Sequence, residues 1–244
     1  MSTDFTNVYD DGVRARAYAG LDFPGTYYLA FRDLPAIIRE HVQGTEALDF
    51  GCGTGRSTRF LRDLGFRVLG VDISEPMLQE ARHRDPQGDY RQVPNGDLSG
   101  LPVSAYDLVL AAFTFDNVPT MEQKVTLFRG LRRSLRPAGR IITIVSTPDI
   151  YVHEWASFST RDFPENRFAH TGDRVRIVML DVEDRRPVED ILWAAEGYDD
   201  VHRESGLVCV QAISPLGHAT EPYAWVSETQ TAPWTIRVLR GSDE

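Results

Sequence analysis

Up to residue 146, short apolar runs alternate with segments in which apolar residues recur three or four positions apart. The runs are typical of buried β-strands, and the spaced residues are typical of helices that pack on one side. Strands are predicted at residues 47–50, 67–71, 90–93, 106–112 and 140–146. Helices are predicted at residues 30–42, 56–64, 75–84 and 121–135. Strands that alternate with helices in this way form a parallel, doubly wound sheet.

The alternation stops after residue 147. Two β-rich runs at 175–180 and 188–193 predict a hairpin, and a short helix is expected at 199–205. The last two strands, at 207–214 and 234–239, have no helical pattern between them. We therefore expect them to form an antiparallel pair at the edge of the sheet.

The predicted fold class is α/β: a Rossmann-like, doubly wound, mostly parallel seven-stranded sheet with an antiparallel C-terminal edge strand and an inserted cap. We expect one domain over residues 1–244, since α/β folds of this length often stay single. Residues 1–29 are read as a leader that covers the site, and residues 148–195 as the cap insertion.

Composition and charge narrow the possible partners. The chain has 26 basic and 36 acidic side chains, a net charge of −10, which argues against a nucleic-acid groove. Four arginines lie at helical spacing and are read as a solvated helix face: Arg129, Arg132, Arg133 and Arg136. The N-terminal residues show no signal pattern, no apolar run is long enough to span a membrane, and only two cysteines occur. A cytoplasmic protein without membrane insertion is expected.

The most informative segment is a glycine-rich loop, Gly51 to Gly55, between the first strand and its helix. Such a loop lets the backbone approach a ligand closely. A phosphate-binding P-loop would require a Gly-Lys-Ser/Thr ending, which is absent. A dinucleotide fingerprint would place its third glycine where Arg56 stands, although that glycine can vary. Asp49 discriminates better, because a carboxylate there would repel a pyrophosphate and suits a cofactor with a cationic amino-acid head.

With Asp49, the segment Leu48-Asp49-Phe50-Gly51-Cys52-Gly53-Thr54-Gly55 resembles motif I of the class I S-adenosylmethionine-dependent methyltransferases. The resemblance spans residues 45–146 and is strongest to the small-molecule enzymes of the ubiquinone/menaquinone biosynthesis type. It implies S-adenosylmethionine as cofactor, S-adenosylhomocysteine as product, and Asp49, Gly51, Cys52, Gly53 and Gly55 as cofactor-binding residues.

Two downstream acids extend the resemblance. Asp72 ends the second strand, where a carboxylate can accept hydrogen bonds from both ribose hydroxyls. Asp97 follows the third strand, where the resemblance implies that the acid reads the adenine amino group and that the Leu98 amide donates to the ring. Each acid alone also fits a helix cap or a surface turn. Further cofactor contacts are implied for Ile73, Met77, Ala112, Phe113 and Tyr28.

Methyl transfer is an in-line displacement that depends mainly on orientation. If the acceptor must lose a proton, the candidate bases are Asp116, which could also cap the next helix, and His153, which could also be a surface residue. Aromatic residues in the leader and the insertion suggest a water-poor chamber for a planar or aromatic acceptor that is methylated on oxygen, nitrogen or carbon. No Cys/His/carboxylate group has metal-ligand spacing, so no metal is expected.

Two alternatives remain open from the residues alone. One is an NAD-dependent oxidoreductase, which Asp49 and Arg56 disfavour. The other is a protein of the methyltransferase fold that binds S-adenosylmethionine without transferring its methyl group, because the cofactor loop would look the same.

Overall fold

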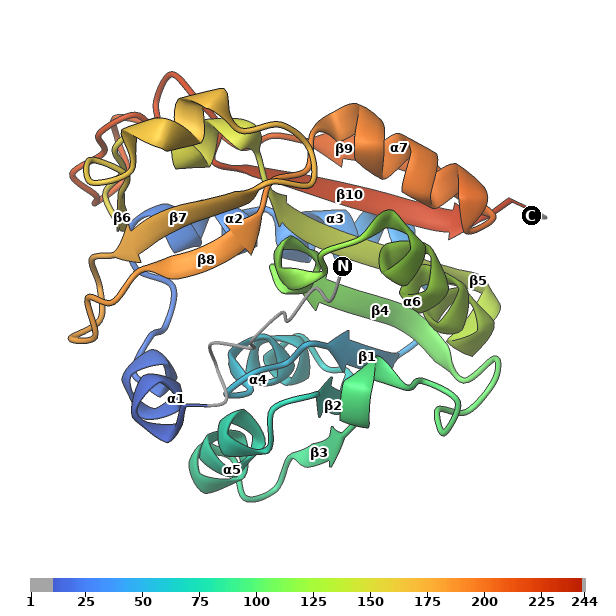
Figure 1. Ribbon diagram of the computed structural model, residues 1–244. Helices are drawn as coiled ribbons and strands as arrows, with labels where there is room; N and C mark the ends of the chain where they lie inside the picture. Colours follow the sequence, from blue (N-terminus) through green and yellow to red (C-terminus); the bar gives the residue numbers. More distant parts are fainter. Residues whose placement is uncertain (1–10, 243–244) are drawn as a thin grey trace.

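A computed structural model describes residues 11–242 of the chain and shows a twisted seven-stranded sheet (Figure 1). The strand order is β3-β2-β1-β4-β5-β10-β9. The strands are β1 (Glu46–Phe50), β2 (Arg67–Asp72), β3 (Asp89–Gln92), β4 (Tyr106–Ala112), β5 (Leu135–Ser146), β9 (Leu207–Ile213) and β10 (Trp234–Gly241). Strands β1 to β5 are parallel, and β10 is antiparallel to both neighbours, β5 and β9. The predicted fold class is confirmed, with β10 one place in from the edge strand β9.

Helices cover both faces of the sheet because side chains alternate along each strand. Along β4, Leu108 and Leu110 pack toward one face, while Val109 and Ala111 pack toward the other. The first face is covered by α2 (Thr26–Arg32), α3 (Leu34–His41) and α4 (Arg56–Asp63). The second is covered by α6 (Met121–Ser134) and α7 (Ala195–Glu204), and α5 (Glu75–Arg84) packs beside β2 and β3 (Figure 1).

Three predicted boundaries are wrong. The helix expected at 199–205 begins four residues earlier, at Ala195, and is α7. The helix predicted at 30–42 consists of α2 and α3, which meet at Asp33. Pro35 stands in the first turn of α3, where its missing N–H is harmless, but it could not continue a helix from α2. The stretch after α6 was expected to be a turn, yet the chain passes directly into β5, where Leu135 pairs with Tyr106 ahead of a bulge.

The insertion, residues 148–195, forms a small antiparallel sheet with the order β6-β7-β8. It contains β6 (Phe158–Ser159), β7 (Arg174–Met179) and β8 (Val188–Ile191), and β7 and β8 form the predicted hairpin. We call this segment the insert. Of the leader, residues 1–10 lie outside the described residues, and the rest contains the helix α1 (Gly12–Ala19), which the sequence pattern does not predict.

Residues 214–233, between β9 and β10, contain no helix or strand and were not interpreted from the sequence. They join the leader to the insert through Glu228, whose side chain is fully buried. Its carboxylate accepts hydrogen bonds from the Thr26 hydroxyl at 2.6 Å and from the Ala156 amide at 2.8 Å. Hydrogen bonds to one buried carboxylate thus connect three segments that are far apart in the sequence: the start of α2, the insert and residues 214–233.

None of the helices within residues 11–242 is long and apolar enough to cross a membrane.

Candidate functional site

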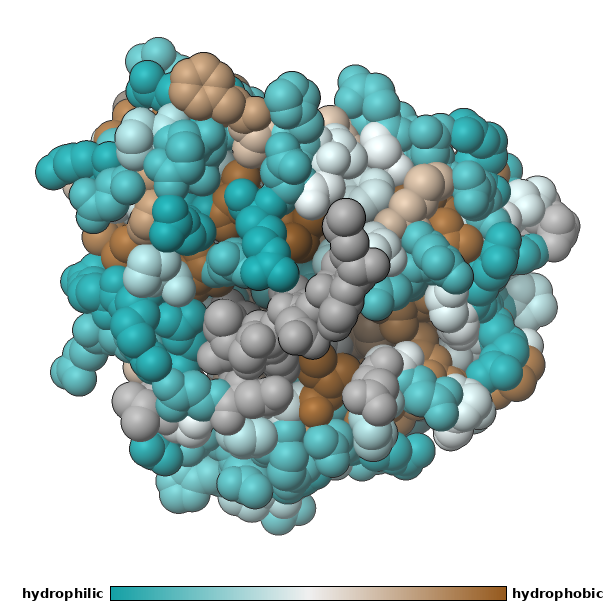
Figure 2. Space-filling view, viewed as in Figure 1, coloured by the Kyte–Doolittle hydropathy of each residue, from teal (hydrophilic) through white to brown (hydrophobic). Residues whose placement is uncertain are grey.

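A cavity of about 870 Å³ opens at the carboxyl ends of β1, β2 and β4, where a doubly wound sheet binds its ligands. Its volume is at the upper end of the range of about 300–1,000 Å³ found for ligand sites. The lining comes from the glycine loop, the ends of β2 and β4, the first turns of α6, and the leader. On the face drawn in Figure 2, apolar side chains gather in the hollowed middle, and the rim is mostly hydrophilic.

The three glycines of the loop all have positive φ, a conformation that favours glycine. A Cβ at Gly51 would overlap the Thr114 side chain, and one at Gly55 would overlap the Tyr90 hydroxyl. At Gly53 the only neighbour is Met77 Cε, at 3.4 Å. Gly51 and Gly55 are therefore required by protein packing, whereas Gly53 leaves space in the cavity.

Asp72 holds the loop in place at the end of β2. One carboxylate oxygen accepts a hydrogen bond from the Gly53 amide and the other from the Ser74 amide, both at 2.8 Å. The Asp72 side chain also lines the cavity. It therefore fixes the backbone at Gly53 and presents negative charge to a ligand.

Asp49 lies beneath the same loop and is fully buried. One of its oxygens, Oδ2, accepts hydrogen bonds from the hydroxyls of Ser57, at 2.7 Å, and Thr58, at 2.6 Å. The other, Oδ1, accepts no hydrogen bond from any described residue. Burial raises the Asp49 pKa to about 6, against the lowering effect of the two hydroxyls.

The opposite wall of the cavity follows β4. Ala112 and Phe113 line it, and Phe113 has φ of 64°, a strained conformation for a bulky residue. The next residue, Thr114, donates a hydrogen bond from its hydroxyl to the Phe50 carbonyl at 2.8 Å. This bond joins the ends of β1 and β4, and a short 3₁₀ turn, Thr114–Asn117, then leads toward α6.

Arg56, the first residue of α4, lines the cavity although it is almost completely buried. Its guanidinium donates to the Asp22 carbonyl at 2.6 Å and to the Tyr18 hydroxyl at 3.2 Å. The rings of Tyr27 and Phe31 lie 4.7 Å and 5.6 Å from it. The leader therefore folds around the residue that directly follows the glycine loop.

These residues fit a ligand that carries positive charge and hydroxyl groups. Asp72 and Asp49, whose Oδ1 accepts no hydrogen bond from any described residue, supply negative charge next to the loop, and Gly53 leaves room for close approach. Within residues 11–242, no three His, Cys, Asp or Glu side chains gather as a metal site requires.

Comparison with known proteins agrees with this geometry. Residues 48–143 match the family described as "Methyltransferase domain". The chain is 26% identical to N-demethylindolmycin N-methyltransferase of Streptomyces griseus over 79% of this chain and 82% of the relative. It is 39% identical to demethylmenaquinone methyltransferase of Tropheryma whipplei, but over only 41% of each. A solved S-adenosylmethionine-dependent methyltransferase from Mesorhizobium loti shares the fold, with a TM-score of 0.61 and 20% identity over 89% of this chain and 98% of that structure.

Residues 48–143 form a methyltransferase domain, and the chain is an S-adenosylmethionine-dependent methyltransferase. Its cofactor is S-adenosylmethionine, and S-adenosylhomocysteine is the product formed from it. The family assignment decides against the NAD-dependent oxidoreductase that the sequence left open.

In this methyltransferase, eight of the residues predicted to bind cofactor line the cavity together: Gly51, Cys52, Gly53, Asp72, Ile73, Met77, Ala112 and Phe113. Asp49 and Gly55 lie just behind the lining and support the loop. The predicted contacts coincide with the cavity lining because the shape of the loop and the position of each strand end depend on residues nearby in the sequence.

Three other predicted contacts lie outside the cavity lining. Asp97 is exposed, and its two oxygens accept hydrogen bonds from the amide and hydroxyl of Ser99. The Leu98 side chain packs in the core on the α6 face of the sheet. The ring of Tyr28 packs at a tilt against that of Tyr223, with centroids 4.9 Å apart, and Tyr18 lies at the cavity in the place expected of Tyr28.

Neither candidate base reaches the cavity. Asp116 is buried behind the lining, where its carboxylate accepts hydrogen bonds from the amide and hydroxyl of Ser146. His153 is largely exposed in the turn that follows a 3₁₀ segment, 3.9 Å from Asp149. The His153 side chain is not among the described residues that line the cavity.

Several lining residues were missed from the sequence: Tyr18, Phe31, Arg56, Thr114, Asn117 and, on the approach to α6 and along it, Val118, Pro119, Thr120, Glu122, Gln123, Thr126 and Leu127. In the sequence analysis Arg56 served only to exclude other cofactors. A cation directly after the glycine loop was itself a sign that this residue lies at the site. The others follow from how α1, α2 and α6 pack, which the local pattern does not show.

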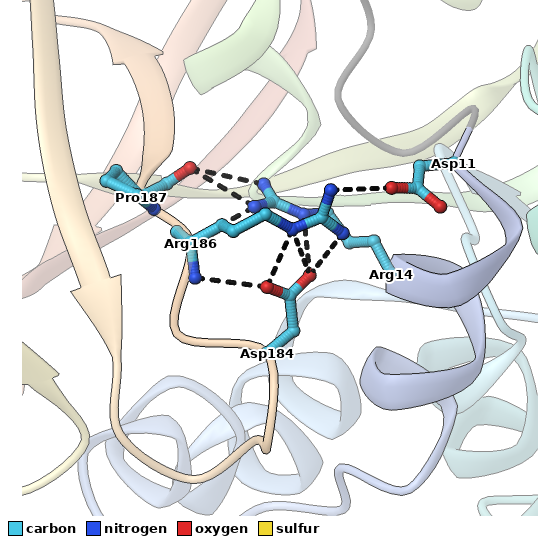
Figure 3. A network of polar contacts seen from close by, with 5 residues as sticks. All are labelled: Asp11, Arg14, Asp184, Arg186 and Pro187. Atoms are coloured by element: carbon cyan, nitrogen blue, oxygen red, sulfur yellow. Dashed lines mark hydrogen bonds and ion pairs between the residues drawn. The ribbon is translucent and has the colours of Figure 1, made fainter.

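Among the described side chains, none from the insert lines the cavity, contrary to the expected chamber beneath it. The insert acts through α1 instead (Figure 3). Arg14, almost completely buried, contacts Asp184 at 3.3 Å and donates to the Pro187 carbonyl at 3.3 Å, in the turn between β7 and β8. Arg186 of that turn pairs with Asp11 at 2.7 Å. Since Tyr18 lies one helical turn beyond Arg14, this contact links the insert to the cavity wall.

Proposed function

We propose that this methyltransferase transfers a methyl group to an oxygen, nitrogen or carbon atom of a small molecule inside the cavity at the strand ends. The observation that carries the proposal is the glycine loop, with Asp72 bound to the Gly53 amide and lining the cavity. Indolmycin and menaquinone in the names of similar enzymes are small molecules, which supports an acceptor of this class. The net charge of −10 argues against a nucleic-acid acceptor.

The residues around the loop would hold the cofactor by charge and shape. Each Asp72 oxygen has a second acceptor site beyond its backbone bond, so the carboxylate can also accept from two ribose hydroxyls. Ile73 and Met77 supply apolar surface beside it, and the free oxygen of Asp49 favours a cationic amino-acid head. When bound, the cofactor supplies an electrophilic methyl group on a sulfonium.

The wall formed by Tyr18, Phe31 and Phe113 faces this end of the cavity with aromatic surface. It would orient a planar or aromatic acceptor and reduce the water around the reacting atoms. Since Asp116 and His153 lie outside the lining, we assign catalysis to orientation and not to a dedicated base. The acceptor would then attack through an atom that is nucleophilic without proton removal by the enzyme.

Binding and turnover test the proposal separately. We expect S-adenosylhomocysteine to raise the melting temperature and to bind in calorimetry, whereas NADH should do neither. Incubation with S-adenosylmethionine and a panel of aromatic amines, phenols and quinone precursors should then yield a methylated product by mass spectrometry. Tight binding of S-adenosylhomocysteine without methylation of any small molecule, together with methylation of a protein or RNA, would contradict the acceptor class.

Substitution of Asp72 by alanine is expected to weaken S-adenosylhomocysteine binding by about tenfold or more, since it removes a charge-assisted contact and the anchor of the Gly53 amide. Isothermal titration calorimetry measures the effect. Asp89→Ala, an exposed aspartate at the start of β3, is the matched control and should bind normally. Unchanged affinity in Asp72→Ala would refute the placement of the ribose.

The raised pKa of Asp49 predicts a pH dependence of cofactor binding. The positive charge of the ligand favours the ionised carboxylate, so affinity should rise as the pH increases through about 6, where Asp49 loses its proton. We expect S-adenosylhomocysteine to bind about tenfold more weakly at pH 5 than at pH 7. The Asp49→Asn variant, titrated by calorimetry over the same range, should lose this dependence, and a slope unchanged in that variant would assign it to another group.

A further inference from the structure

The chain contains a single lysine, Lys124, and its side chain is fully buried. It lies near the start of α6, and its amine donates a hydrogen bond to the Phe115 carbonyl. The rings of Trp193 and Tyr198 lie 4.8 Å and 5.3 Å from the nitrogen. A buried ammonium is costly unless charges and hydrogen bonds compensate for the lost water. The groups around it should therefore serve a purpose beyond packing.

Two carboxyl groups supply this compensation from different elements. Asp116 stands in the turn Thr114–Asn117 and is held by Ser146 at the end of β5. Asp190 belongs to β8 of the insert and accepts a hydrogen bond from the Tyr151 hydroxyl at 3.1 Å. Both carboxyls attract the Lys124 ammonium electrostatically.

Burial shifts the pKa values of all three groups toward the neutral range. Burial lowers the pKa of Lys124 to about 7 and raises the pKa of Asp116 to about 6. Burial, together with the charge of Asp116, raises the pKa of Asp190 to about 8. Other titratable or charged groups near the cluster are Glu189 on β8, Tyr151 before β6, Tyr198 on α7 and Arg237 on β10.

This cluster connects the cavity to the insert. Thr114 and Asn117 line the cavity, and Phe115 and Asp116 lie between them in the same turn. Thr114 also bonds to Phe50 and lies directly against Gly51, so a displaced turn would disturb the glycine loop. No described side chain of the insert touches the cavity itself, yet β8 packs on this turn.

We propose that Lys124 is a positioning residue for methyl transfer, because its protonated amine holds the Phe115 carbonyl by a hydrogen bond and attracts the carboxyl groups of Asp116 and Asp190, and thereby fixes the turn at 114–117 as a wall of the cavity. The inference rests on the proposed function, since this turn borders the site assigned there to cofactor and acceptor.

A single lysine makes the test direct. Protein labelled with ¹³C-lysine gives one side-chain resonance to follow by NMR. We expect it to titrate near pH 7, well below the ordinary value of about 10.4, and to shift when S-adenosylhomocysteine binds. In Asp116→Asn the lysine pKa should fall further, because the attracting carboxylate is gone.

Two variants separate positioning from stability. Lys124→Met leaves the buried Asp116 carboxylate without the positive charge near it and should lower the melting temperature by about 10 °C. The double variant Lys124→Met/Asp116→Asn removes both charges and should recover most of that loss. Its affinity for S-adenosylhomocysteine should nevertheless remain about fivefold weaker than wild type, because the turn is no longer held.

The outcomes are distinguishable. A resonance that titrates like a solvated lysine, or that does not respond to bound S-adenosylhomocysteine, overturns the inference and leaves the proposed function standing. Full recovery of affinity along with melting temperature in the double variant would also overturn it, since Lys124 would then be only structural. Failure of wild-type protein to bind S-adenosylhomocysteine in calorimetry would overturn the proposed function itself.

Discussion

Substitution of Gly53 by arginine should weaken S-adenosylhomocysteine binding by about a hundredfold or more, because the new side chain would occupy the cavity. Gly53 has φ of 52°, and among residues 11–242 the only atom near its missing Cβ is Met77 Cε at 3.4 Å. The arginine would therefore enter open space beside Asp72 and add positive charge where a cationic ligand is expected. The protein should stay folded, since no packed neighbour has to move.

The chain offers a matched control at Gly172, which has φ of 96° and no atom within 4 Å of its missing Cβ. Gly172→Arg introduces the same backbone strain and charge in the insert, away from the cavity lining, and should bind S-adenosylhomocysteine normally. Calorimetry on both variants, with circular dichroism to verify folding, measures the difference. Equal affinities would show that the ligand does not pass over Gly53.

Substitution of Glu228 by alanine is expected to cost about 3–5 kcal/mol of unfolding free energy. The fully buried carboxylate accepts hydrogen bonds from the Thr26 hydroxyl and from the amides of Ala156 and Val226. Alanine would leave all three donors without a partner in the interior. For a chain of this size the melting temperature should fall by about 10 °C.

Chemical denaturation measures this loss, and two variants calibrate it. Glu204→Ala makes the same chemical change at an exposed position at the end of α7 and should alter stability by less than about 0.5 kcal/mol. Glu228→Gln keeps an accepting oxygen and should lie between the two. If Glu228→Ala were as stable as Glu204→Ala, the leader and insert would not depend on this carboxylate.

Much of the fold could be predicted because its signals are local. The alternation of Leu108, Val109 and Leu110 along β4 reflects a strand buried on both faces. Gly51 and Gly55 are required by φ and by contacts at their own positions. Asp72 could be predicted as a cofactor contact from its place at the end of a strand. The carboxyl ends of parallel strands all lie at one edge of the sheet.

The errors in the site follow from contacts that are distant in the sequence. Tyr28 and Tyr18 are both leader tyrosines, and only the packing of α1 decides that Tyr18 reaches the cavity. The pattern of hydrophobic and polar residues does not show which of two similar side chains contacts a cavity wall that is formed by a distant part of the sequence.

From the sequence alone, the glycine loop, the acids around it and the order of strands determined the cofactor and predicted the place where it binds, because each depends on backbone geometry within a few residues. The tertiary structure decided what surrounds that place. Asp116 and Lys124 are buried near each other, and the insert contacts α1 through Arg14 and does not line the cavity. Burial and charge pairing arise only when distant segments meet, and they determine which of the candidate side chains can act on a ligand.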